Sequence, residues 1–151
     1  MFATETMINL KESNFKMVGK IEELTFRDLV KTKFSAPRHI LYLELGIIPA
    51  RFVIKQRKIM YLKTMLNNTD NSLLRKTYKS QIKSPTRGDW VSEVKEIMKE
   101  LNIQLSLKEI SIKSRNKFKP IVKTKIENSA DSYLRAIQQQ KQKGKFINIP
   151  N

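Results

Sequence analysis

The segment from Ala50 to Leu66 most constrains the fold, because it is apolar around most of a helical circumference. At about 100° per residue, Phe52 and Ile59 fall on one side of the helix, whereas Val53 and Met60 fall on another. A helix with apolar side chains nearly all round is normally buried at the centre of a domain. We therefore expect this helix to be surrounded by other helices.

Turn residues and helical periodicity divide the rest of the chain. Pro37 in the first turn and Gly46 beyond the last predict a short helix, and Pro49 opens the next one. No run alternates in the manner of a strand, so we predict an all-α single domain of about five to seven helices with frayed termini. The expected helices span residues 20–34, 37–45, 50–66, a segment capped by Asp70 or Asn71 that reaches Ile82, 90–101, 107–113, and a last helix capped by Ser114 that reaches Ile137.

Local capping signals support the later helices. Asp89 is a good N-cap for the helix that follows it, and Ser106 with Glu109 three residues on forms a capping-box pattern. Pro120 falls inside the last predicted helix, which therefore either begins near it or kinks there. We expect three parts: a loose N-terminal arm over 1–17, a basic helical domain over 18–138, and a flexible polar tail over 139–151. The alternative for the first part is one short element that ends near Gly19.

The charge balance narrows the function. The 151 residues include 30 Lys and Arg against 14 Asp and Glu, a formal net charge of +16, which favours a polyanionic partner. With no cysteine and one histidine, disulfides, thiolate zinc sites and cysteine nucleophiles are excluded, and we expect no metal and no cofactor. Residues 38–54, the most apolar stretch, fall short of the ~18 apolar residues of a membrane span. Since the start also lacks a secretory signal, we expect no membrane partner and a cytoplasmic or nuclear location.

Two stretches of the chain hold many cations and almost no acids. Between Glu44 and Asp89 the only acid is Asp70, and the stretch from Lys113 to Lys125 contains none. Lys and Arg spaced along helices suit the neutralisation of phosphates, without reading of bases. The predicted nucleic-acid-binding residues are Arg51, Lys55, Lys58, Arg75, Lys79, Lys83, Arg87, Lys117, Lys119 and Lys123.

Several of these signals have a second interpretation. Tyr61, Tyr78 and Phe118 lie among the cations and could stack on unpaired bases, but they could equally belong to the core. Arg87 would stand close to a helix N-terminus, where backbone N–H groups favour an anion. The alternative is a plain helix–loop–helix joint anchored by Trp90.

The supply of catalytic groups is poor. Glu93, Glu96 and Glu100 recur on one helix face beside lysines, which is typical of i, i+4 pairing on a solvent face. His39 is the only histidine, and a Ser-His-Asp or metal centre needs more partners than the chain offers, so we expect it to be structural. We predict that the chain is not an enzyme. The alternative hypothesis in which the chain is an enzyme is a nuclease or polymerase fragment.

Several motifs resemble the C-terminal, post-polymerase region of non-LTR (LINE-type) retroelement reverse transcriptase proteins. The likeness covers about residues 35 to 135 and implies no catalytic residue, because that region lies outside the polymerase active site. The motifs that carry it are Tyr42-Leu43-Glu44 with Gly46, Pro49 and Arg51, then Arg57-Lys58-Ile59-Met60-Tyr61, then Pro85 to Val91, then Leu105-Ser106 with Glu109-Ile110.

Charge and resemblance together give the functional expectation. We expect a non-catalytic basic helical module, derived from a retroelement, that binds nucleic-acid backbone, with RNA favoured over DNA. At most it is a fragment of a reverse transcriptase that lacks the catalytic domain. Besides nucleic acid, the candidate partners are an upstream polymerase domain and an acidic protein. The alternative is a protein-interaction scaffold or a non-functional retroelement remnant.

Overall fold

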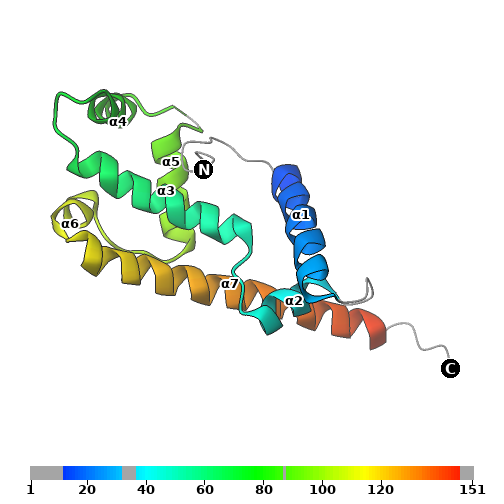
Figure 1. The fold of residues 1–151 in the computed structure, drawn as a ribbon. Coiled ribbons are helices and arrows are strands. Elements are labelled where there is room, and N and C mark those ends of the chain that lie inside the picture. Colours follow the sequence, from blue (N-terminus) through cyan, green and yellow to red (C-terminus); the bar gives the residue numbers. More distant parts are fainter. Residues whose placement is uncertain (1–11, 32–36, 87, 147–151) are drawn as a thin grey trace.

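The computed structural model describes residues 12–31, 37–86 and 88–146. Over those ranges the chain forms seven α-helices and no strand, which confirms the all-α prediction. In Figure 1, α4 lies above α3, α7 runs below it, and α1 and α2 lie to its right. The helices are α1 (Glu12–Val30), α2 (Arg38–Leu45), α3 (Ala50–Asn67), α4 (Leu73–Lys83), α5 (Trp90–Glu100), α6 (Leu107–Ile112) and α7 (Arg115–Phe146).

Helix α3 is the centre of the fold, as its apolar circumference predicts. It packs against α1, α4, α5, α6 and α7, and only Arg57, Thr64 and Asn67 among its residues are exposed. Ile59 and Leu62 are 0% exposed, and Phe52 is buried as predicted. Val94 of α5 and Phe118 of α7 are also completely buried in the same cluster. The domain therefore has one main core, built around a single helix.

A glycine and two prolines set the ends of α2 and the start of α3. Gly46 has a left-handed φ of 60° and ends α2 by donating its N–H to the Leu43 carbonyl. Pro37 and Pro49 are the N-cap residues of α2 and α3, and neither supplies a side-chain hydrogen bond. Pro37 was expected inside the first turn and stands one position earlier. The pattern Ser35-Ala36-Pro37 also predicts a cap directly before Pro37, and Ser35 and Ala36 lie outside the described residues.

The cap of α4 is not the predicted one. Ser72 is the N-cap, and its hydroxyl accepts the N–H of Arg75 at 3.2 Å. Asp70 instead turns to the cations of α4, which corrects the expectation that Asp70 or Asn71 caps this helix. The difference is physical: Ser72 directly precedes the first helical residue, where a short hydroxyl reaches the exposed N–H groups of the first turn.

The caps of α5 and α6 agree with the sequence. Asp89 accepts the N–H of Ser92 at 2.7 Å, and its other oxygen accepts the N–H of Thr86 at 2.9 Å. Ser106 and Glu109 form the complete capping box. Both caps use hydrogen bonds within three residues, which is why the sequence alone could predict them.

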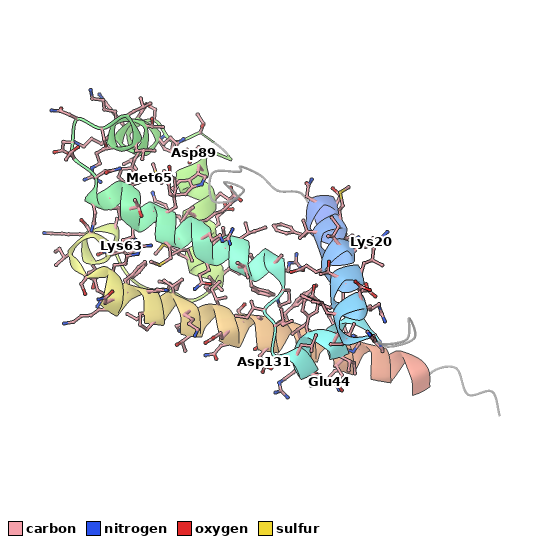
Figure 2. The ribbon with its side chains drawn as sticks, in the orientation of Figure 1. Lys20, Glu44, Lys63, Met65, Asp89 and Asp131 are labelled. Atoms are coloured by element: carbon pink, nitrogen blue, oxygen red, sulfur yellow. The ribbon has the colours of Figure 1, made fainter. Side chains whose placement is uncertain are left out.

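A buried lysine holds α6 against α3. Lys63 is 4% exposed, and its ammonium donates to the carbonyl of Ile110 at 2.7 Å and to the carbonyl of Lys113. It lies on the part of α3 that faces α6 (Figure 2). These carbonyls belong to the C-terminal end of α6, where a cation is favoured by the helix dipole. Burial lowers the pKa of Lys63, while the two carbonyl oxygens stabilise its charged form.

The ends of the chain contain more helix than expected. Helix α1 begins at Glu12 and continues through Gly19, so residues 12–17 are helical where the sequence suggested a loose arm or one short element ending near Gly19. Helix α7 begins at Arg115, includes Pro120 and runs to Phe146, well into the predicted tail. Pro120 is exposed, so water can replace the hydrogen bond that its missing N–H would have made.

Candidate nucleic-acid interface

Two of the predicted contacts on α3, Lys55 and Lys58, form ion pairs with acids of α5. Lys58 is 1% exposed, and its ammonium lies 2.5 Å from a carboxylate oxygen of Glu93. One turn away, Lys55 meets Glu100 at 2.6 Å. This corrects the expected pairing of Glu93 and Glu100 with neighbouring lysines on a solvent face, because both acids reach across to α3 instead. Lys58 is thereby removed from the surface available to a phosphate.

Arg51 is held by aromatic side chains. It donates a hydrogen bond to the Tyr133 hydroxyl at 2.9 Å, and its guanidinium lies 5.0 Å from the Tyr133 ring centroid and 5.3 Å from that of Phe15. A guanidinium between two rings keeps its charge and loses rotational freedom. Arg51 therefore faces the junction of α1, α3 and α7, away from the cations of α4.

Three lysines of α4 share one stripe of the helix surface. Lys76, Lys79 and Lys83 recur at i, i+3 and i+7 and are all exposed, whereas Tyr78 on the other face is buried. Lys79 approaches Asp70 at 2.9 Å, and the two cations on Asp70 lower the pKa of its carboxyl. The sequence interpretation named Lys79 and Lys83 but missed Lys76, which helical spacing alone could have added.

Arg75 lies apart from that stripe. Its Nε is 3.4 Å from Asp70, and its guanidinium lies 5.3 Å from the Tyr78 ring centroid. It is 21% exposed, so it packs along α4 rather than projecting outward.

The first half of α7 presents the densest acid-free group of cations. Lys117, Lys119 and Lys123 are all exposed. The side chains of Lys117 and Lys119 form no hydrogen bond or ion pair with another described residue, and the Lys123 ammonium lies 3.6 Å from Glu127. Exposed pairs of this kind contribute little, about 0–1 kcal/mol, so these ammonium groups can exchange their partners for phosphates.

The predicted contacts do not all lie on one surface. In Figure 1, α3 separates α4 from α7, so the lysine stripe of α4 and the cations of α7 lie on opposite sides of the central helix. Arg87 is outside the described residues. The structure therefore divides the predicted residues into an α7 group, an α4 group, and cations of α3 that contact other side chains.

The three aromatic residues belong to the core. Phe118 is 0% exposed and Tyr78 is 5% exposed. Tyr61 is half-buried and forms an edge-to-face contact with Trp90, with ring centroids 5.6 Å apart. Phe118 and Tyr78 are too buried to stack on a base, and Tyr61 packs against the core, so of the two interpretations the structure supports packing.

Acids in the described part of the chain serve local structure. Asp89 and Glu109 cap helices, and hydrogen bonds from backbone and side-chain donors lower the pKa of both carboxyls. Glu22 of α1 accepts the Ala50 N–H at 3.0 Å, so it supplies the cap of α3 that Pro49 cannot. His39 is buried. Among the described residues, no group of three or more His, Asp or Glu side chains could hold a metal ion.

Comparisons with known proteins add no relative. No protein-family model, curated protein or solved structure matches the chain. Over the residues that the structure describes, no helix is long and apolar enough to cross a membrane. The geometry of the cations is therefore the basis for a functional proposal.

Proposed function

We propose that this protein is a non-catalytic module that binds the phosphate backbone of nucleic acid, RNA in preference to DNA, through the first half of α7. The observation that carries the proposal is the run of cations on α7 without an acid before Glu127. It comprises Arg115, Lys117, Lys119, Lys123 and Lys125. The lysine stripe of α4 is a second contact for strands long enough to pass around α3.

The distribution of charge supports the choice of the α7 surface. Cations exceed acids by 16, and Glu93, Glu100, Asp89 and Glu109 are committed to ion pairs or caps. Lys117, Lys119 and Lys123 of α7 are exposed, and exposed cations release the counterions of a polyanion on binding. The preference for RNA and a retroelement origin rest on the motif resemblance alone and are part of the proposal.

The test is fluorescence anisotropy of labelled single-stranded RNA and duplex DNA across a salt series. Replacing Lys117, Lys119 and Lys123 by Gln should weaken binding by the same factor on unrelated sequences. Each phosphate contact contributes roughly 0.7 (single strand) to 0.9 (duplex) to the steepness with which log K falls with log salt concentration. The slope of the triple variant should therefore be shallower by about two to three units. A matched control removes three exposed lysines elsewhere: Lys95, Lys99 and Lys108 to Gln.

Two results would contradict the proposal. One is absence of binding at low salt. The other is a control triple variant that weakens binding as much as the α7 variant, because the effect would then reflect net charge rather than the α7 surface. Binding to a polyglutamate peptide but not to nucleic acid would favour the scaffold alternative. Metal-dependent cleavage of the labelled strand would overturn the non-catalytic assignment.

A further inference from the structure

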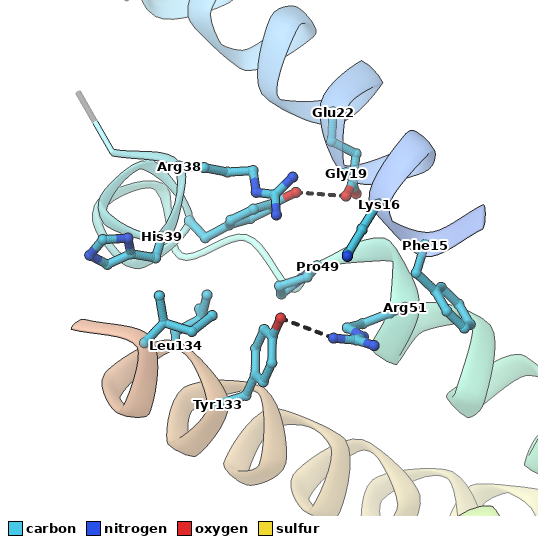
Figure 3. A pocket seen from close by; sticks show the side chains of 12 residues that line it. Phe15, Lys16, Gly19, Glu22, Arg38, His39, Pro49, Arg51, Tyr133 and Leu134 are labelled. Carbon is cyan, nitrogen blue, oxygen red and sulfur yellow. Dashed lines mark hydrogen bonds between the residues drawn. The ribbon is translucent and has the colours of Figure 1, made fainter. Parts of the chain in front are cut away.

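A cavity of about 230 Å³ lies where α1, α2, α3 and α7 meet. Figure 3 shows Lys16, Arg38 and Arg51 extending toward it from three different helices. Its size is below the ~300–1,000 Å³ of pockets for drug-sized ligands, so it suits a small molecule or a chain end. It lies apart from the α7 lysines.

The cavity has an unbalanced charge. Its three Lys and Arg side chains face one acid, Glu22, which leaves a formal balance of 3 − 1 = +2 between them. The Glu22 carboxylate is already engaged, because it accepts the Tyr42 hydroxyl at 2.6 Å and the Ala50 N–H at 3.0 Å. These bonds hold Glu22 in place and occupy its oxygens.

Two of the three cations, Arg51 and Arg38, are held by the residues around them. Arg51 is held by the Tyr133 hydroxyl at 2.9 Å and lies against two rings. Gly19 leaves room for Arg38, since a Cβ at that position would lie 2.7 Å from the Arg38 Nη1 atom. A preorganised guanidinium loses less entropy when it binds an anion.

We propose that this cavity binds a phosphomonoester group. At pH 7 a phosphomonoester carries about −1.5 to −2 charges and three strong acceptor oxygens, which matches the +2 balance and the forked donors of two arginines. An internal phosphodiester and a carboxylate each carry about one charge, so both match the +2 balance less well. Leu134 and Ile137 of α7 supply an apolar wall for the organic part of the ligand. The same chemistry occurs in a free small phosphomonoester and in the phosphorylated end of a strand.

The test is isothermal titration calorimetry of the whole chain with phenyl phosphate, a 5′-phosphorylated dinucleotide, its 5′-hydroxyl counterpart and dimethyl phosphate. Both monoesters should bind more tightly than dimethyl phosphate, and the tighter of the two identifies the source. Arg38→Gln and Lys16→Gln should each weaken monoester binding by about tenfold or more, as expected for a lost hydrogen bond to a charged group. Gly19→Ala should weaken it by displacing the Arg38 guanidinium.

Lys20→Gln is the matched control, because Lys20 is exposed one turn from Lys16 and does not line the cavity. It should leave the affinity unchanged, and circular dichroism should show that all variants keep the parent fold. Equal affinity for monoester and diester, or loss of affinity in Lys20→Gln equal to that in Lys16→Gln, would overturn the proposal. The α7 triple variant should bind phenyl phosphate normally, so failure here is distinguishable from failure of the nucleic-acid proposal.

Discussion

The ion pair between Lys58 and Glu93 should be much more sensitive to mutation from one side than from the other. Lys58 is 1% exposed and Glu93 is 19% exposed. Glu93→Ala leaves an ammonium group buried without its counter-charge, which typically costs about 3–5 kcal/mol. Lys58→Met keeps the apolar stem and leaves a carboxylate that can turn to water, so we expect a loss of only about 1 kcal/mol.

The double variant measures the coupling free energy between Lys58 and Glu93. Once Lys58 is Met, removing Glu93 should cost little more, so the coupling between the two changes should exceed about 1.5 kcal/mol. Urea unfolding, followed by circular dichroism and by the fluorescence of Trp90, gives these free energies. For a chain of this size about 3 kcal/mol corresponds to a fall of roughly 6–12 °C in melting temperature.

Lys55 and Glu100 provide a matched control on the same two helices. Their side chains are 18% and 53% exposed, so Glu100→Ala should cost at most about 1 kcal/mol, and high salt should reduce that cost. If Glu93→Ala and Glu100→Ala destabilise the protein equally, or if Lys58→Met is the more harmful of the Lys58–Glu93 single variants, the assignment of a buried ammonium to α3 is refuted.

Three further predictions follow from the packing and the titrating groups. Trp90→Ala removes a side chain that is 5% exposed and should cost about 3–5 kcal/mol in urea unfolding; a melt identical to that of the parent would exclude Trp90 from the core. Asp89→Ala should cost about 1 kcal/mol. The N–H of Ser92 lowers the pKa of Asp89, so its stabilisation is complete above the ordinary Asp pKa of about 4 and is lost as the pH falls through the folded value, which an acid titration of stability in parent and variant would measure. Burial and Glu22 raise the pKa of Tyr42, so its stabilisation holds below the ordinary Tyr pKa of about 10 and is lost as the pH rises through the folded value. Absorbance at an alkaline pH series should show a late-titrating tyrosine that Tyr42→Phe removes.

Features that depend on neighbours in sequence could be predicted from the chain. The caps at Asp89 and Ser106, the glycine stop at Gly46 and the central position of the helix from Ala50 all follow from hydrogen bonds or periodicity within a few residues. Such signals are local, so they need no knowledge of what packs where. They determined the all-α class and most helix boundaries.

The tertiary structure decided which cations reach solvent. In the sequence, Lys58 and Lys63 cannot be told apart from Lys117, yet the first two are buried and the last is exposed. Periodicity gives the angle of a side chain around its own helix but does not say which acid or carbonyl the next helix brings there. Because α3 packs against five other helices, Lys58 and Lys63 find their partners on α5 and α6, whereas α7 covers the core with one face and leaves the other to water. The same assembly of distant segments places Lys16, Arg38 and Arg51 around one cavity, since they come from three helices whose meeting only the fold determines.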